Sequence, residues 1–337
     1  MSAITTLVNK LDKFPRVYAA HAPTPIDTLD NLSNDLGIRL SVKRDDCTGV
    51  AFGGNKVRQL EFYLGEAIAM KADTLLITGA VQSNFVRTAA AMSAKYDLRC
   101  HVQLEERVST SSSHYREGGN VLLNKLLGAT VHSFAVGEDE SAADDALDTI
   151  ARQLRVEGAN PYVVHLGTAH PPIGALGYVA AAIEFAAQIP DIEAVDEIFI
   201  GSGSALTHTG LLYGLRALGI DIPVRGVCVR RPYEAQLQRV TQRLQEVGEM
   251  LDVQVGASEI LLTDKTLTPG YGVMSDYTRE VIENTASREG LIVDPVYTGK
   301  VMAAVFQEAH RLQGKHVLMW HTGGQPAVFA YQDQLGY

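Results

Sequence analysis

The chain has few cysteines, and their spacing excludes two kinds of cysteine chemistry. Cys47, Cys100 and Cys228 are the three cysteines among 337 residues, and no two of them form a Cys-x-x-Cys pair. A zinc knuckle and a disulfide framework are therefore not expected, and no metal site is predicted. We predict three reduced thiols, as is usual for proteins of the cytoplasm.

The sequence also lacks long apolar runs and an excess of basic residues. Residues 1–17 have no apolar core of a signal peptide, and no stretch approaches the roughly 20 apolar residues that cross a bilayer. The net charge of -10 argues against nucleic acid as the main partner. We expect a cytoplasmic protein without a nucleic-acid or membrane partner.

What is present is an alternation of short apolar runs with helical patterns. In the first half, strands are predicted at 72–80, 99–106, 130–136 and 161–167, with helices at 83–98, 118–129 and 140–158. In the second half, strands are predicted at 196–203, 224–231 and 316–324, with helices at 173–189, 207–219, 278–290 and 299–314. This rhythm is typical of an α/β protein with parallel sheets covered by helices. The Ser-rich segment 107–119 is predicted to be a mobile surface loop and a candidate lid.

Three junctions between a strand and a helix carry candidate ligand-binding groups, because open α/β sheets bind ligands beyond the carboxyl ends of their strands. At the first, Gln82, Ser83 and Asn84 crowd a helix start. The free N–H groups of that start suit a carboxylate. Ordinary helix capping is the alternative, and it needs one of these three side chains.

The second junction, residues 199–210, follows a strand with Gly201 and Gly203 and opens a helix near Thr207. Small residues let the backbone wrap an oxyanion at the positive end of the helix, so we predict a phosphate cradle. The segment is neither a P-loop nor a clean GxGxxG, since Leu206 stands where a third glycine would fall, and a dinucleotide-binding dehydrogenase is disfavoured. A tight turn before a packed helix is the alternative.

The third junction, residues 320–326, delivers Thr322 to a Gly-Gly turn. Its hydroxyl could meet a ring nitrogen or cap a helix.

Lys56 supplies a reactive group that these loops lack. It follows Gly53, Gly54 and Asn55 and precedes an apolar helical stretch. A buried lysine amine with a lowered pKa forms Schiff bases with carbonyl compounds. A structural lysine is the alternative for Lys56 alone, but the combination of such a lysine with a phosphate cradle is what pyridoxal phosphate requires.

Eight segments resemble, in order, the motifs of one family. They are residues 14–33, 42–49, 53–62, 79–84, 118–129, 174–179, 294–300 and 321–324. The chain resembles the fold-type II pyridoxal-phosphate enzymes, in the branch of D-cysteine desulfhydrase, 1-aminocyclopropane-1-carboxylate deaminase and L-cysteate sulfo-lyase. Each motif is short, but the set is specific and spans nearly the whole chain.

The resemblance implies a two-domain architecture similar to that of the tryptophan synthase β subunit, in which each domain is a mostly parallel sheet flanked by helices. Residues 1–53 and 168–337 would form the large domain, and residues 54–167 the small one. The cofactor would lie in the cleft between them. The resemblance also implies a homodimer.

The resemblance further implies the roles of individual residues. Lys56 would bond to pyridoxal phosphate and move the α-proton of the substrate. The other residues expected to hold the cofactor are Asn84 at the 3-hydroxyl, Ser204, Ala205, Leu206 and Thr207 at the phosphate, and Thr322 at the ring nitrogen.

The substrate would be a small amino acid. The residues expected to contact it are Gln82, Ser83, Asn84, Phe85, His170, Tyr271 and Tyr297, with Ser83 and the two tyrosines counted as catalytic beside Lys56. Core packing is the alternative for both tyrosines. A tyrosine of ordinary pKa is a poor base at neutral pH, so these two would act as acids or be perturbed.

Four positions depart from the family pattern. Phe85 and Phe52 add aromatic rings, His170 is a moved histidine, and Leu206 is unusual in the phosphate loop. The two rings and the histidine are expected near one pocket. They would repack the helix, change the choice of substrate or abolish the standard reaction. Thr298 stands where the cyclopropane deaminase carries a glutamate, which favours β-elimination over ring opening.

We therefore predict a pyridoxal-phosphate-dependent lyase that eliminates the β-substituent of a small amino acid. D-Cysteine, giving pyruvate, ammonia and sulfide, is the first candidate substrate, and L-cysteate is the second. 1-Aminocyclopropane-1-carboxylate deamination and a catalytically weak protein that binds the cofactor or an amino acid are the alternatives.

Overall fold

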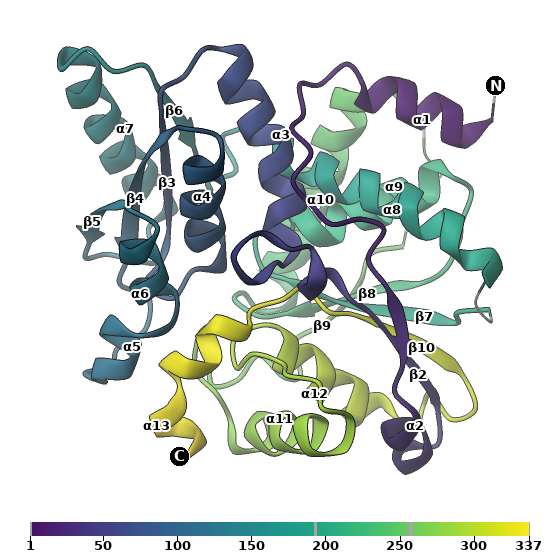
Figure 1. The fold of residues 1–337 in the computed structure, drawn as a ribbon. Helices are drawn as coiled ribbons and strands as arrows, with labels where there is room; N and C mark the ends of the chain where they lie inside the picture. Colours follow the sequence, from purple (N-terminus) through teal and green to yellow (C-terminus); the bar gives the residue numbers. More distant parts are fainter. Residues whose placement is uncertain (1, 192–193, 254, 256–258, 337) are drawn as a thin grey trace.

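The computed structural model describes residues 2–191, 194–253, 255 and 259–336, and it contains two sheets that lie side by side (Figure 1). The four-stranded sheet has the order β5-β4-β3-β6 and is parallel throughout. Its strands are β3 (Thr74–Ala80), β4 (Arg99–Glu105), β5 (Thr130–Phe134) and β6 (Pro161–Val164). All seven residues of β3 are buried, as expected for an inner strand covered on both faces.

Helices cover both faces of this sheet. They are α3 (Asn55–Ala69), α4 (Asn84–Lys95), α5 (Ser113–Glu117), α6 (Gly119–Leu126) and α7 (Glu140–Val156). One face packs against α3, α4 and α6 through a cluster that includes Leu60, Val86 and Val121. The other packs against α7 through Leu76 and Leu147.

The six-stranded sheet has the order β1-β2-β10-β7-β8-β9. Its strands are β1 (Ile26–Thr28), β2 (Arg39–Lys43), β7 (Glu197–Ser202), β8 (Val224–Cys228), β9 (Leu261–Thr263) and β10 (His316–Trp320). The pairs are parallel except at the edge, where β1 runs antiparallel to β2. Both chain ends thus contribute to one sheet, since β2 pairs with β10.

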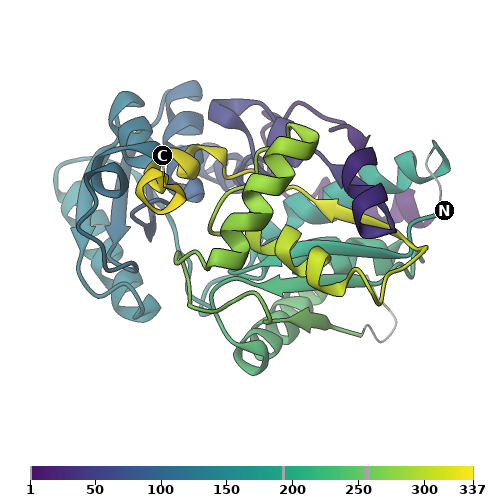
Figure 2. The ribbon, with the colours of Figure 1, turned by 90° about the horizontal axis from the view of Figure 1, so that it is seen from below.

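Two groups of helices enclose this sheet. The elements outside the small sheet are α1 (Ala3–Leu11), α2 (Asp30–Leu36), α8 (Leu176–Gln188), α9 (Leu206–Ala217), α10 (Tyr233–Leu251), α11 (Asp276–Glu289), α12 (Thr298–Glu308) and α13 (Gln332–Leu335), with the short 3₁₀ helices η1 (Asp45–Cys47), η2 (Val50–Phe52), η3 (Ile173–Ala175), η4 (Ile189–Asp191) and η5 (Gln325–Ala330). The helices α2, α11 and α12 pack on one face, and α8 and α9 pack on the other. Figure 2, seen from below, shows α11 and α12 across the near face of the larger sheet.

The helix α3 lies between the two sheets and carries Lys56 in its first turn (Figure 1). It contacts α4 on one side and α8 on the other. Its contact with α8 is close, because a Cβ on Gly177 would overlap the backbone oxygen of Arg58. Lys56 is therefore held where the two halves of the molecule meet.

The α/β class and the two helix-flanked sheets confirm the fold predicted from the sequence. The predicted strands at 72–80, 99–106, 196–203 and 316–324 are present with ends that differ by a few residues. The membership of the sheets is compatible with a division at residues 53 and 167, and those boundaries stay a prediction. No described helix is long and apolar enough to cross a membrane.

The segment 107–119 differs from the loop that was predicted. It contains the whole of α5, and its Ser112 and His114 side chains bond to Asp333 in α13. The segment does lie at the surface, with Ser111, Ser113 and His114 exposed. Its polar side chains also serve as a helix cap and as a connection to the other end of the chain, and its mobility and its role as a lid stay predictions.

Candidate functional site

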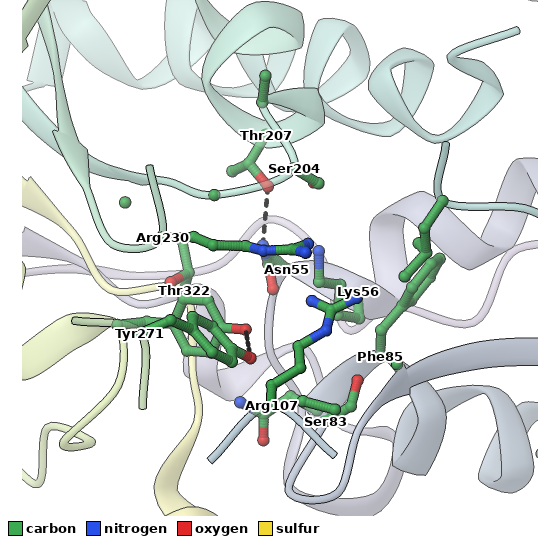
Figure 3. Close-up of a pocket in the computed structure, with 18 of the residues that line it drawn as sticks. Asn55, Lys56, Ser83, Phe85, Arg107, Ser204, Thr207, Arg230, Tyr271 and Thr322 are labelled. Atoms are coloured by element: carbon green, nitrogen blue, oxygen red, sulfur yellow. Dashed lines mark hydrogen bonds between the residues drawn. The ribbon is translucent and has the colours of Figure 1, made fainter. Parts of the chain in front are cut away.

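A cavity lies between the two sheets, at the carboxyl ends of their strands (Figure 3). The small sheet contributes Gly79 and Ala80 from β3, and the large sheet contributes Gly201 from β7 and Thr322 just after β10. Of the residues predicted to form the site, the cavity is lined by Lys56, Ser83, Asn84, Phe85, Ser204, Ala205, Thr207, Tyr271, Tyr297 and Thr322.

The glycine pair before Lys56 is required by the path of the backbone. Gly53 and Gly54 have φ of +61° and +107°, a region that side chains disfavour. A Cβ on Gly53 would overlap the backbone oxygen of Asp46, and one on Gly54 would lie 3.0 Å from the backbone oxygen of Thr322. The pair thus lets the segment pass between η1 and the end of β10, and α3 then begins at once and presents Lys56.

The Lys56 amine is poorly solvated. Its Nζ donates to Gln59 Oε1 at 3.0 Å and lies 4.9 Å from the centre of the Phe85 ring. No carboxylate of the described residues pairs with it, and burial lowers the pKa of Lys56 to about 8. A larger share of this amine is therefore neutral and nucleophilic near neutral pH than for an exposed lysine.

Thr207, in the first turn of α9, is arranged to donate a hydrogen bond into the cavity. Its Oγ1 accepts from Asn55 Nδ2 and from Gln59 Nε2, both at 2.8 Å (Figure 3). A hydroxyl has two acceptor lone pairs and one proton, so both lone pairs are engaged and the proton remains for an acceptor in the cavity. The first N–H groups of α9 also have no partner within the helix, so this end of α9 favours an anion.

Arginines support the loop before α9 from behind. Arg231 Nη1 donates to the backbone oxygen of Gly203, and Arg239 Nε donates to that of Ser204, each at 3.1 Å. Ala205 has a φ of +76°, unusual for a residue with a Cβ. The loop thus keeps a glycine-like conformation and directs two carbonyl oxygens toward the arginines.

Asn84, the first residue of α4, has a fixed side chain. Its Oδ1 accepts from Asn120 Nδ2 at 2.9 Å and from Arg87 Nη2 at 3.5 Å. Arg87 is buried without a carboxylate partner and also donates to the backbone oxygens of Ala51 and Gly53, in the segment before Lys56. With its oxygen engaged, Asn84 keeps its Nδ2 as the donor for the cavity.

Ser83 caps α4 and also lines the cavity. Its Oγ accepts from the backbone N–H of Val86 at 3.3 Å, which leaves the hydroxyl proton free to donate. Thr322, across the cavity, has no side-chain hydrogen bond to another described residue, so its hydroxyl is available to a bound group.

Tyr271 and Tyr297 form a pair at the edge of the cavity. Their hydroxyl oxygens are 2.8 Å apart, and their rings meet edge to face (Figure 3). Burial, with the Tyr271 hydroxyl beside it, raises the pKa of Tyr297 well above its ordinary value. Tyr297 therefore stays protonated at neutral pH and can donate a hydrogen bond.

Three residues predicted for the site do not line the cavity. Gln82 uses its amide to bond the backbone of Tyr115, Gly118 and Asn120, and the Leu206 side chain packs into the apolar cluster under α9. His170 stacks on His165 with ring centres 3.7 Å apart and lines a separate surface hollow. For His170 this is a correction, because a residue near a motif in sequence can turn its side chain to the other side of the loop. The roles predicted for Gln82 and Leu206 can still be filled by their backbone N–H groups and stay predictions.

One further expectation about the unusual positions, that of Phe52, is wrong. Phe52 is 57% exposed at the surface and does not share the cavity with Phe85. Thr298 is fully buried outside the cavity, where its hydroxyl bonds to Asp294 Oδ1 at 2.8 Å.

The structure adds charged residues that sequence reasoning missed. Arg107, Glu140, Arg230 and Arg239 line the cavity. Glu140, at the start of α7, accepts from Arg230, Arg231 and Arg239 of the large-sheet half. Burial acts against its charge, but these arginines hold the pKa of Glu140 at about 2. In the sequence, nothing distinguished Arg107 from the other polar residues of segment 107–119. Only the fold brings it beside Lys56.

Comparison with known proteins gives the family. The profile of the family described as "Pyridoxal-phosphate dependent enzyme" matches residues 17–323. The chain belongs to this family. It is 40% identical over 332 residues to a D-cysteine desulfhydrase from Klebsiella pneumoniae, with 97% of this chain and 99% of that protein covered.

Solved structures agree with this membership. A crystal structure described as that of an ACC deaminase homologue is 35% identical, with a TM-score of 0.88 and 98% of both chains covered. An O-ureido-L-serine synthase is 18% identical, with a TM-score of 0.63 and coverage of 96% of this chain and 94% of that one, and shares the fold.

Pyridoxal phosphate is the cofactor of this family, and the cavity fits it. A desolvated amine on Lys56, the anion-favouring start of α9 and the free hydroxyl of Thr322 match an aldehyde, a phosphate and a ring nitrogen. Among the described residues, no group of histidine, cysteine, aspartate or glutamate is arranged to hold a metal ion.

Proposed function

We propose that this enzyme catalyses α,β-elimination from a small amino acid, with D-cysteine as the first candidate substrate. D-Cysteine and water would give pyruvate, ammonia and hydrogen sulfide. The observation that carries this proposal is one cavity that contains a desolvated lysine, a free serine hydroxyl at a helix start and a hydrogen-bonded tyrosine pair. The 40% identity to D-cysteine desulfhydrase over nearly the full length supports the same reaction.

Each residue of the cavity has a proposed task. Bound pyridoxal phosphate supplies an electron sink for the α-carbon of an amino acid joined to it. Its phosphate would be bound by the Thr207 hydroxyl and the N–H groups of Ser204, Ala205 and Leu206. Asn84 Nδ2 would donate to the 3-oxygen of the ring, and the Thr322 hydroxyl would contact the ring nitrogen.

The substrate carboxylate would bind at the start of α4. The Ser83 hydroxyl and the first N–H groups of that helix are donors on the cavity side. Lys56, which would hold the cofactor at its aldehyde, lies in the same cavity and would be beside the substrate amine.

Lys56 Nζ would then accept the α-proton, and its pKa of about 8 suits such a base. The β-substituent leaves with the electron pair of its bond to carbon. The hydroxyl pair of Tyr271 and Tyr297 would donate a hydrogen bond to the leaving group. The 2-aminoacrylate so formed hydrolyses to pyruvate and ammonia.

The experiment is to add D-cysteine to the cofactor-loaded protein and to quantify keto acid and sulfide. Pyruvate and sulfide in equal amounts would support the proposal, and Lys56→Ala should abolish both. If no keto acid forms from D-cysteine, L-cysteate or β-chloroalanine, elimination is ruled out as the function.

Deamination of 1-aminocyclopropane-1-carboxylate is a second candidate, favoured by the similarity to the ACC deaminase homologue. Its product, 2-oxobutyrate, separates it from elimination. Thr298 argues against it as the counterpart of a catalytic glutamate, since its side chain is engaged with Asp294 outside the cavity.

We also propose that the protein is a homodimer in the cytoplasm. The family resemblance supports the dimer, and three unpaired cysteines suit a reducing compartment. Light scattering on the purified protein and fractionation of the source cells test these two points.

A further inference from the structure

Arg107 is a buried cation at the cavity whose donors are not all used. Its side chain is 5% exposed, two residues after the end of β4. Nε and Nη2 both donate to Glu105 Oε2, and Nη1 has no hydrogen bond to another described residue. The guanidinium lines the cavity, whereas Glu105 does not.

Glu105 fixes Arg107 rather than occupying the cavity. The carboxylate is 1% exposed, and its Oε1 accepts from Thr78 Oγ1 at 2.6 Å. Both carboxylate oxygens are therefore engaged outside the cavity. The position of the guanidinium is thus set before any ligand binds, which reduces the entropy that binding would cost.

A second buried guanidinium approaches from the other half of the molecule. Arg230 is 8% exposed, its Nη1 pairs with Glu140 and its Nη2 with Glu138, and its Nε is buried without a hydrogen-bond partner. Figure 3 shows Arg107 on the side of Ser83 and Arg230 on the side of Thr207, with both guanidinium groups directed toward the space beside Lys56. Two buried guanidinium groups thus line one cavity, and the donor that is free for a ligand is Nη1 of Arg107, since both Nη atoms of Arg230 pair with glutamates.

The free donor of Arg107 would be satisfied by an anionic acceptor other than the cofactor phosphate. The anion-favouring start of α9 lies on the Thr207 side, away from Arg107 (Figure 3). The substrate carboxylate has its own donors at Ser83 and the start of α4. A group on the β-carbon is the remaining part of a small amino acid that can reach Arg107.

We propose that Arg107, with Arg230 opposite it, binds a negatively charged group on the β-carbon of the substrate. This inference rests on the elimination proposed above, and it places amino acids with an anionic β-substituent, such as a sulfonate, ahead of D-cysteine, whose thiol is mostly neutral at pH 7. A neutral substituent leaves buried guanidinium donors unpaired, and such a mismatch is a strong source of discrimination.

For a sulfonate the reaction balances without a further reactant. The α-proton goes to Lys56, the Cβ–S bond breaks, and sulfite leaves with the electron pair of that bond. The 2-aminoacrylate takes up water and gives pyruvate and ammonium. Arg107 is placed to contact the sulfonate oxygens as negative charge grows on the departing sulfite.

The test compares charged and neutral substituents on the same three-carbon skeleton. We expect kcat/KM of the wild-type holoenzyme for one enantiomer of cysteate to exceed that for β-chloroalanine and S-methylcysteine by about 10-fold or more. In Arg107→Met, kcat/KM for cysteate should fall by about 10- to 100-fold, while the values for the neutral substrates change by less than about 3-fold. Inhibition by 3-sulfopropanoate, which lacks the amine and cannot react, should weaken in parallel.

Two further variants separate recognition from folding. Arg107→Met leaves Glu105 buried without its partner, so the double variant Glu105→Gln/Arg107→Met removes both charges and should give the same loss with cysteate. Arg107→Lys keeps the positive charge and should recover part of the kcat/KM for cysteate that Arg107→Met loses. Arg99→Gln, at the exposed start of the same strand, is the matched control and should change nothing.

The outcomes distinguish this inference from the proposed elimination. Equal loss with charged and neutral substrates would mean that Arg107 binds the α-carboxylate, and would overturn the inference while elimination stands. A wild-type preference for neutral substituents would overturn it as well. Release of no keto acid from any of these substrates would refute the elimination itself.

Discussion

Asn55 Nδ2 donates to Thr207 Oγ1 at 2.8 Å, so the residue before Lys56 is bonded to the first turn of α9. This bond joins the segment that carries the reactive amine to the segment that favours an anion, across the two halves of the molecule (Figure 3). An aldehyde and a phosphate on one ring must be held at a fixed separation, and the Asn55–Thr207 bond helps to set it.

Thr207→Val should weaken both the bonds to Asn55 and Gln59 and the binding of the cofactor phosphate. The valine leaves the amide donors of Asn55 and Gln59 without their acceptor, which costs about 1–3 kcal/mol, and it removes a donor to the phosphate. We expect weaker binding of pyridoxal phosphate and a lower melting temperature of the apoprotein. Titration of apoprotein with the cofactor and thermal unfolding measure the two effects.

Thr209→Val on the same helix is the matched control for Thr207→Val. Thr209 is fully buried, and its Oγ1 has no partner among the described residues, so its removal should be neutral or stabilising. Equal losses for both variants would indicate that packing around α9, rather than the hydroxyl of Thr207, is responsible.

Loading of the apoprotein with cofactor should depend on pH through Lys56. The neutral amine is the form that attacks an aldehyde, and burial lowers the pKa of Lys56 to about 8. The neutral fraction grows as pH rises through that value, so the loading rate should rise between about pH 7 and 9 and then level off. Stopped-flow absorbance measures the rate, and a continued rise to about pH 10.5 would show that Lys56 behaves as an ordinary lysine.

Ala205→Gly should relieve backbone strain in the loop before α9. Ala205 has a φ of +76°, which costs a residue with a Cβ about 1 kcal/mol and costs glycine almost nothing. We expect the melting temperature of the apoprotein to rise. Ala186→Gly, inside α8, is the control and should lower it, since helical backbone there favours alanine. A decrease for both variants would mean that Ala205 is not strained.

Asp45→Asn should destabilise the protein strongly. The buried carboxylate of Asp45 accepts from Arg58, Tyr178 and Trp320, and its backbone oxygen accepts from Gly54 in the segment before Lys56. Breaking one side of a buried ion pair costs about 3–5 kcal/mol. Urea unfolding measures the loss, and Asp35→Asn, in an exposed pair with Arg288, should change the free energy of unfolding by less than about 1 kcal/mol.

The same carboxylate should contribute to acid sensitivity. Burial disfavours its charged form, but the charge and hydrogen bonds of Arg58 outweigh burial and lower the pKa of Asp45. A lowered carboxyl pKa stabilises the fold above the unfolded pKa of about 4, and this stabilisation is lost as pH falls below it. The free energy of unfolding of Asp45→Asn should therefore fall less steeply with acid than that of the wild type.

Much of the fold could be predicted because the local patterns agree with it. Buried strands such as β3 and β10 are continuous apolar runs, and α7 begins at acidic residues and ends near Gly158. The helix α10 was missed although Val240, Val247 and Leu251 recur at helical spacing after Pro232. Here the signal was present in the sequence and was overlooked.

Some residues of the candidate site could be predicted from the sequence, and others could not. Lys56 could be found because its glycine neighbours and the following helix are contiguous in sequence. Arg107 and Glu140 could not, since their meeting with Lys56 depends on how two sheets pack. His170 was misplaced because a motif position does not fix the direction of a side chain, and stacking on His165 turns this ring away from the cavity.

The most direct measurement is to find which residue carries the cofactor. The holoenzyme would be reduced with borohydride, digested and analysed by peptide mass spectrometry. The account predicts a phosphopyridoxyl group on Lys56 and none in Lys56→Ala. The same group on Lys43 or Lys300, which are also buried lysines with lowered pKa, would contradict the account, as would cofactor that remains bound without any modified lysine.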